Sequence, residues 1–117
     1  MIFHILKKEE WQRAVERGYY EPASLKTEGF VHCSTREQAP GTANRYYYGQ
    51  TDLVLLSIDP SRLTAELRLE PPANPHDERA HEVFPHVYGP INLDAVRHAV
   101  DFACDSAGSF HWPPAIS

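Results

Sequence analysis

The sequence EGFVHCST, residues 28 to 35, places polar side chains capable of chemistry directly behind an apolar pair, in a stretch otherwise typical of a buried strand. The two-residue period of a strand puts Phe30, His32 and Ser34 on one face. A histidine on a half-buried face must find a hydrogen-bonding partner or line a cavity that holds one, because burying an unpaired polar group is costly. The stretch therefore predicts that His32 and Ser34 point together toward a polar partner.

Four of the seven histidines, at positions 4, 32, 81 and 86, fall in or beside expected strands. Their strand parities predict that His4, His32 and His86 face a common cavity. His4 lies between the apolar Ile2 and Leu6 on one strand face. An imidazole at this place is expected to meet a polar group of a ligand that the empty protein does not supply.

A metal site is one interpretation of the histidines. His76, His81 and His86 recur every five residues, and histidine is a common zinc ligand. A step of five fits neither one face of a strand nor one stripe of a helix. The two cysteines form no paired ligand motif either, so no bound metal is expected.

Acid–base or nucleophilic catalysis is a second interpretation, with His32 or His86 activating Ser34 or Cys33. No glycine elbow surrounds Ser34. Cys33 is expected to point away from His32, because adjacent residues of a strand face opposite sides. The pattern therefore gives little support to a hydrolase triad.

A ligand cleft is the third interpretation. Imidazoles, hydroxyls and aromatic faces suit a nucleotide or another flat polar ligand, and the chain supplies them at His4, His32, Ser34, the tyrosines 46 to 48, Glu70 and Tyr88. The sequence contains no glycine-rich phosphate loop. For each histidine the structural alternative, in which the ring only bridges backbone groups in the core, stays open.

Length and charge limit the classes of protein and partner. The 117 residues suit one domain, residues 1 to 117, with a single core. A formal net charge of -5, without a basic stripe, predicts no appreciable binding to duplex DNA. The apolar runs are too short for a signal peptide or a membrane span, so we expect a soluble cytoplasmic protein. Its Cys33 and Cys104 are then expected to be reduced.

The hydrophobic pattern predicts a mixed α+β domain with a partly antiparallel sheet. The first half is expected to contain a strand at 2–6, an amphipathic helix ended by Gly18, a loop at 19–29, a strand at 30–34 and a helix reaching about Tyr48. A central strand at 52–59 and a strand at 65–70, with Leu67 and Leu69 inward, should follow. The remainder is expected to be a proline-rich connection at 71–80, a strand at 81–91 with Pro85 at a bulge or an edge, a short helix or turn at 92–100, and a tail at 109–117 packed across the surface.

Four motifs stand along the chain: FHIL, EGFVHCST with the later Gln38, DLVLLSID and FPHVYGPI. In the order and spacing of these motifs the chain resembles the domain-of-unknown-function 952 proteins, a family of small bacterial proteins, over nearly its whole length. The resemblance implies an ADP-ribosyltransferase-like α+β fold, with a split, mostly antiparallel β-sheet, two main helices and a central cleft for NAD. The layout is also similar to that of RNA 2'-phosphotransferases.

The resemblance also implies roles for individual residues. His4 matches the first-strand histidine that contacts the ribose and nicotinamide side of NAD, and His32 and Ser34 match polar positions of the second strand. Ile5 stands where NAD-binding relatives usually have glycine. Either Glu70 or Glu82 would be the catalytic carboxylate.

These observations lead to one functional hypothesis and one alternative. The hypothesis is binding of NAD or a related nucleotide, extending to glycosyl (ADP-ribosyl) transfer. Glu70 and His32 would be catalytic, and His4, Ser34, His86 and Tyr88 would bind the ligand. The alternative is a non-catalytic module for a small metabolite or a partner. The two differ in whether Glu70 or Glu82 converges with His4 and His32 on one cavity.

Overall fold

The computed structural model describes residues 1–114 as an α+β arrangement in which every strand pairing is antiparallel. The first sheet has the order β1-β4-β8, with β1 at Ile2–Lys7, β4 at Leu53–Ile58 and β8 at Val96–Phe102. The second has the order β3-β6-β5, with β3 at Val31–His32, β6 at Phe84–Tyr88 and β5 at Glu66–Glu70. A third, small sheet pairs β2 (Tyr19–Tyr20) with β7 (Ile91–Asn92).

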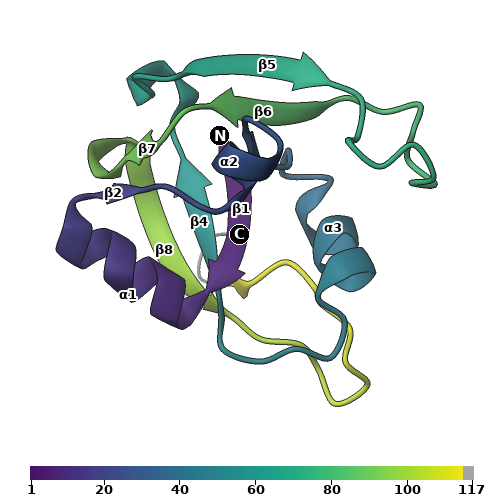
Figure 1. Ribbon diagram of the computed structural model, residues 1–117. Coiled ribbons are helices and arrows are strands. Elements are labelled where there is room, and N and C mark those ends of the chain that lie inside the picture. The colour runs from purple at the N-terminus through teal and green to yellow at the C-terminus, as the bar shows by residue number, and fades with distance from the viewer. Residues whose placement is uncertain (115–117) are drawn as a thin grey trace.

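The first and second sheets meet at one point. Phe3 of β1 exchanges two backbone hydrogen bonds of 2.8 Å with Ser34, just beyond β3. In Figure 1, β5 and β6 cross above the ends of β1 and β4, so the two sheets diverge from this bridge. The split antiparallel arrangement therefore places the second half of β1 at a free sheet edge.

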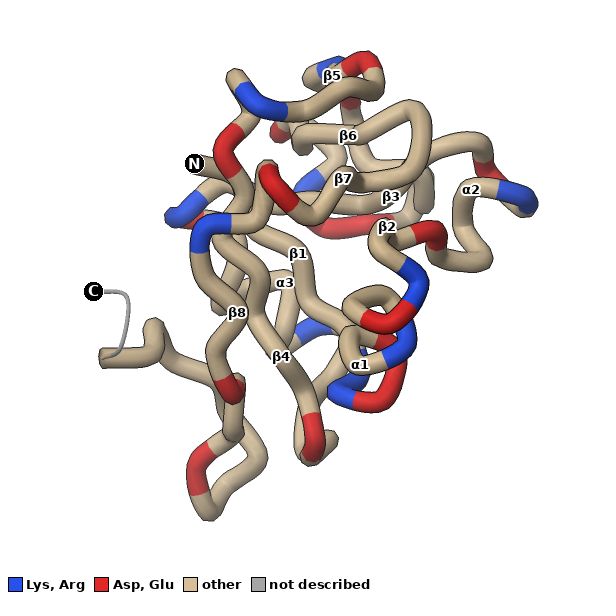
Figure 2. The backbone as a smooth tube through the Cα atoms, turned by 90° about the vertical axis from the view of Figure 1, so that its left-hand side faces the viewer, with Lys and Arg blue, Asp and Glu red and all other residues tan. Residues whose placement is uncertain are grey.

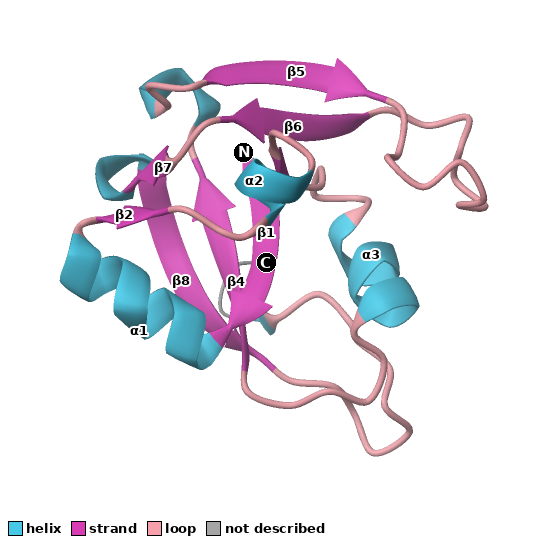
Figure 3. Ribbon diagram, viewed as in Figure 1, coloured by secondary structure: helices cyan, strands magenta, loops and turns pink. Residues whose placement is uncertain are grey.

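Three helices cover the sheets: α1 at Lys8–Arg17, α2 at Ser24–Thr27 and α3 at Ala39–Tyr46. Short 3-10 turns lie at Pro60–Arg62 and Leu93–Ala95. Figure 3 shows α1 and α3 on opposite sides of the first sheet. Gly18 ends α1 in the left-handed conformation, with φ of 96°, as its position in the sequence predicts.

The core lies on both faces of β4, whose six residues are all buried. One face packs Leu56 and Ile58 with Ile2 and Leu6 of β1 and with Ala14 of α1. The other packs Leu53 and Leu55 with Phe3, Ala39, Ala43, Phe102 and Phe110. An uninterrupted apolar run is typical of such a doubly covered strand, so the prediction of a central strand is confirmed.

Charged residues of both signs alternate along α1, as Figure 2 shows. Ala14 and the partly buried Trp11 are the positions of this helix that pack against the core. The amphipathic pattern thus fixes which face of α1 turns inward. Among residues 1–114 no helix has the length and hydrophobicity needed to cross a membrane. Cys33 and Cys104 are free thiols.

Some expected elements are wrong. The short helix or turn predicted at 92–100 is present only at Leu93–Ala95, and β8, the longest strand of the described residues, begins at Val96. The pattern did not reveal β8 because most of its residues are exposed at a sheet edge. The expected loop at 19–29 contains β2 and α2. Leu67 packs against the core, but Leu69 is 64% exposed near the end of the edge strand β5.

Pro85 lies in β6, the middle strand of its sheet, and not at an edge. Its carbonyl accepts a hydrogen bond of 3.0 Å from Cys33, beyond the two residues of β3. The nitrogen and oxygen of a strand residue point to the same side, so the missing N–H faces the side on which β3 has ended. Proline is tolerated here because β5, on the other side, needs no donor from it.

The described part of the tail joins no sheet, as expected, but it does not only pack across the surface, because Phe110 is buried in the core and Trp112 packs against that core. The prediction for residues 115–117 falls outside the described part of the chain.

Candidate functional site

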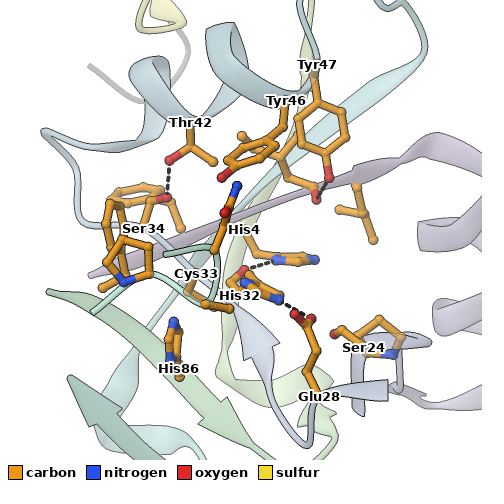
Figure 4. Close-up of a pocket in the computed structure, with 18 of the residues that line it drawn as sticks. His4, Ser24, Glu28, His32, Cys33, Ser34, Thr42, Tyr46, Tyr47 and His86 are labelled. Carbon is orange, nitrogen blue, oxygen red and sulfur yellow. Dashed lines mark hydrogen bonds and ion pairs between the residues drawn. The ribbon is translucent and has the colours of Figure 1, made fainter. Parts of the chain in front are cut away.

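A cleft of about 520 Å³ lies beside β1, where this strand diverges from β3. Figure 4 shows its two walls: α3 and the residue that follows it contribute Thr42, Tyr46 and Tyr47, and the second sheet contributes His32 and His86. Lys7, Glu10, Glu28, Asp77 and Arg79 add charged groups to the lining. The cleft therefore combines imidazoles, phenols, hydroxyls and charges of both signs.

Both ring nitrogens of His4 have hydrogen-bond partners within the protein. Its Nδ1 lies 2.5 Å from the backbone oxygen of His32, and its Nε2 lies 2.8 Å from the hydroxyl of Tyr20. Burial lowers the pKa of His4 to about 4, although the hydrogen bond to His32 acts in the opposite direction. The ring is therefore neutral near pH 7. The expectation that a ligand must supply its polar partner is wrong, because Tyr20 and the carbonyl of His32 supply both.

His32 is held by a carboxylate from the preceding turn. Its Nε2 lies 2.5 Å from Oε2 of Glu28, and the two side chains are 45% and 39% exposed. Both residues line the cleft, as Figure 4 shows. A second carboxylate–imidazole pair joins Glu70 Oε1 and His86 Nδ1 at 2.9 Å. The ring centroids of His32 and His86 are 5.7 Å apart.

The Glu70–His86 pair is embedded in an aromatic cluster. Phe30 stacks on His86 with a centroid distance of 4.0 Å, and the Tyr88 hydroxyl donates to Glu70 Oε1 at 2.5 Å. Hydrogen bonds from Tyr88 and His86 hold the pKa of Glu70 below its usual range. Glu70 and Tyr88 stand behind His86 and are not among the residues that line the cleft.

A hydroxyl pair forms another part of the lining. Ser34 Oγ lies 2.9 Å from Thr42 Oγ1, which also accepts a hydrogen bond of 2.9 Å from Arg79 Nη1. These contacts connect the end of β3, helix α3 and the loop between β5 and β6. Ser34 is thus joined to Thr42 and not to a histidine, which agrees with the weak support for a hydrolase triad.

Asp77 fastens the proline-rich loop to α3. Its buried carboxylate accepts bonds from Arg79 N at 2.8 Å and Tyr46 Oη at 2.8 Å, and it lies 3.3 Å from Arg45 Nε. Burial alone would raise the pKa of Asp77, but the donors from Arg79 and Tyr46 outweigh it and hold the pKa well below its usual range. The loop therefore forms a fixed wall of the cleft.

Cys33 lines the cleft without reactive character. Burial raises the pKa of its thiol to about 12. The thiolate is the nucleophilic form of cysteine, so Cys33 stays protonated and unreactive near neutral pH.

The backbone of β1 also reaches the cleft. In an antiparallel strand, alternate residues direct both N–H and C=O to the same side. Phe3 directs these groups to Ser34, so Ile5 directs its own to the same side, where the cleft lies. The Tyr47 hydroxyl donates to the Ile5 carbonyl at 3.5 Å, a long hydrogen bond.

The structure brings four of the six predicted site residues, His4, His32, Ser34 and His86, to one cleft. Glu82, the other carboxylate considered, accepts a hydrogen bond from Gln38 at 3.2 Å and is also absent from the lining. Neither expected carboxylate therefore converges directly on the cavity.

Sequence reasoning missed Glu10, Glu28, Asp77 and Arg79 in the lining. Glu28 stands four residues before His32, a spacing that could have indicated the pair. Asp77 and Arg79 lie in the loop that the sequence predicts to be only a connection, and no local pattern marks their contacts with α3. Within residues 1–114 no three His, Cys, Asp or Glu side chains gather in a way that could hold a metal ion.

Comparisons with known proteins agree with this architecture. A model of the family described as "Protein of unknown function (DUF952)" matches residues 5–99. The X-ray crystal structure of protein CC0527 from Caulobacter crescentus is 32% identical, with a TM-score of 0.80 and coverage of 94% of this chain and 92% of that chain. The solution NMR structure of CC0527 is also 32% identical, with a TM-score of 0.71 and coverage of 94% and 90%. No curated protein matches the chain.

Proposed function

Because the chain belongs to the family of proteins of unknown function described as DUF952, we propose its function from the geometry of the cleft: binding of a nucleotide of the NAD class. The observation that carries the proposal is the edge of β1 at Ile5, which no other strand of the described residues covers and where only the long hydrogen bond from Tyr47 reaches the carbonyl. This edge lies inside a cleft that also holds aromatic and hydroxyl groups. The split antiparallel arrangement supports the relation to ADP-ribosyltransferases that the sequence motifs imply.

The free edge suits a planar carboxamide. A backbone N–H and C=O on the same side of one residue can pair with the acceptor and donor of an amide, as a neighbouring strand would. Nicotinamide carries such a group. The side chain of Ile5 does not block this pairing, because it projects perpendicular to the plane of the backbone hydrogen bonds.

The remainder of the cleft suits the rest of a nucleotide. Its volume of about 520 Å³ falls within the roughly 300–1,000 Å³ typical of ligand pockets. Tyr46 is 48% exposed at the rim and offers a face for a base. The hydroxyls of Ser34 and Thr42 and the cations of Lys7 and Arg79 supply partners for ribose and phosphate.

ADP-ribosyl transfer is a narrower proposal, and it has less support. Its chemistry needs a carboxylate facing the ribose as nicotinamide departs with the bonding electron pair. Glu70 stands behind His86, whereas Glu28 lines the cleft beside His32. We therefore propose binding as the function, with Glu28 in place of Glu70 as the carboxylate that a ligand would meet.

Calorimetric titration of the intact protein with NAD, ADP-ribose and nicotinamide tests the proposal. We expect NAD to bind at micromolar concentration. His32→Ala should weaken binding about three- to tenfold, since one hydrogen bond to a neutral group contributes about 0.5 to 1.5 kcal/mol. The matched control is His76→Ala, because His76 is exposed and lies outside the lining.

Failure of all three compounds to bind at millimolar concentration would overturn the nucleotide proposal and leave the metabolite-binding alternative. Equal affinities of the parent and His32→Ala would place the bound nucleotide outside this cleft.

A further inference from the structure

His86 has one ring nitrogen occupied and one open. Glu70 Oε1 lies 2.9 Å from Nδ1, and Nε2 makes no hydrogen bond among the described residues. Every solvent-inaccessible side-chain nitrogen or oxygen in that part of the chain has a partner. The Nε2 atom must therefore reach solvent, although the residue as a whole is only 3% exposed. The cleft is the space that His86 lines.

The Glu70 contact determines the protonation of the neutral ring. A carboxylate only accepts hydrogen bonds, so Nδ1 must carry the proton that it donates to Glu70. The lone pair of the neutral imidazole is then on Nε2, the atom that reaches the cleft. The hydrogen-bond acceptor at Nδ1 thus determines that Nε2 is the ring nitrogen that can accept a proton.

Glu70 is itself held in place. The Tyr88 hydroxyl donates to the same Oε1 atom, and the Arg68 guanidinium lies over the Tyr88 ring at 4.3 Å. His86 opposes Arg68 across the β5–β6 ladder, so Glu70 is its diagonal neighbour on the same sheet face. Phe30 stacks on the imidazole and fixes the plane of the ring.

We propose that the Glu70–His86 pair is an acid–base device that takes a proton from a hydroxyl group or a water molecule bound in the cleft. The proton moves to Nε2, and the oxygen uses the released electron pair to bond to the electrophilic atom of the substrate. The leaving group departs with its own bonding pair and receives the proton back from Nε2. The class of reaction is group transfer to a hydroxyl, or hydrolysis when the hydroxyl is that of water.

The roles of the two residues differ. His86 is the catalytic residue, because its Nε2 meets the reacting hydroxyl. Glu70 is a positioning residue that holds Nδ1–H and stabilises the imidazolium formed by proton transfer. This assignment replaces the expected role of Glu70 as a carboxylate in contact with the ligand. It does not depend on the ligand being a nucleotide.

Two measurements on the ligand-free protein test the proposal. Long-range ¹H–¹⁵N NMR should show neutral His86 with its proton on Nδ1, the less common tautomer of a free imidazole. Diethyl pyrocarbonate, an acylating reagent, should modify His86 at Nε2, as followed by peptide mass spectrometry. Glu70→Gln should lower the modification rate of His86 at least fivefold, and Glu70→Asp should restore part of it.

Glu66→Gln is the matched control, because Glu66 lies on the same strand face and pairs with Arg68 instead of a histidine. It should leave the modification rate of His86 unchanged. Both Glu66→Gln and Glu70→Gln should leave the modification rate of the exposed His76 unchanged. A proton on Nε2 of neutral His86, or equal rates in Glu70→Gln and Glu66→Gln, would overturn the proposal. These readouts need no nucleotide, so they separate this failure from failure of nucleotide binding.

Discussion

His4 and His86 are both imidazoles on strand faces beside the cleft, and they differ in how many ring nitrogens the protein occupies. Both nitrogens of His4 have protein partners, Tyr20 and the carbonyl of His32. His86 lines the cleft and has one such partner, Glu70, whereas its other nitrogen makes no hydrogen bond among the described residues. A polar residue on an apolar strand face can thus have a structural or a catalytic role. The role depends on whether the fold leaves one of its polar atoms without a hydrogen-bond partner in the protein.

Lowering the pH should have the largest effect on the free energy of unfolding, because His4 has a structural role. Its pKa is about 4 in the folded protein and about 6.5 in the unfolded chain, so between these values the unfolded state binds more protons. The free energy of unfolding should therefore fall as pH is lowered from 6.5 toward 4, by about 3 kcal/mol from this residue. Urea unfolding across that range measures the loss.

His4→Gln should remove much of this slope, because glutamine does not titrate. A variant with the same slope as the parent would show that other groups cause the acid sensitivity.

Removing the His4 ring should have the next largest effect. His4→Ala leaves Tyr20 without its partner and opens a cavity, so we expect a loss of about 2 to 3 kcal/mol of unfolding free energy. His98→Ala on β8 is the control: His98 is exposed, and its truncation should change stability by less than about 0.5 kcal/mol. Equal losses of unfolding free energy in the two variants would contradict the structural role of His4.

Tyr20→Phe tests the same site with a smaller change. The variant keeps the aromatic ring and removes only the hydroxyl bonded to His4 Nε2. We expect unfolding free energy to fall by about 1 to 2 kcal/mol, because the imidazole nitrogen loses its partner in a buried place. Urea unfolding at pH 7.5, where His4 is neutral, makes the measurement.

Tyr88→Phe is the corresponding change in the open region and should have the smallest effect. It removes the hydroxyl bonded to Glu70, whose side chain is 32% exposed. Water can replace the lost donor, so we expect a loss of about 0.5 kcal/mol in the same unfolding assay. A loss as large as that of Tyr20→Phe would remove the distinction between the two regions.

Local patterns predicted the elements that have strong periodicity. The apolar run of β4, the amphipathic face of α1 and its stop at Gly18 follow from burial on two faces, burial on one face and backbone freedom. The pattern failed for β8, because the exposed His98 interrupts the apolar face formed by Val96, Val100 and Phe102. It also failed for Pro85, whose place in a central strand depends on where β3 ends.

The sequence by itself determined the strand parities that place His32, Ser34 and His86 along a common cleft and put Glu70 on the face of β5 opposite to Leu67. Only the tertiary structure decided which atoms of these side chains remain open. The structure pairs His4 Nε2 with Tyr20, His32 Nε2 with Glu28, and His86 Nδ1 with Glu70. Parity is a local property of the backbone, whereas the partner of each ring nitrogen depends on how separate strands and turns pack together, because a hydrogen bond requires contact within about 3 Å.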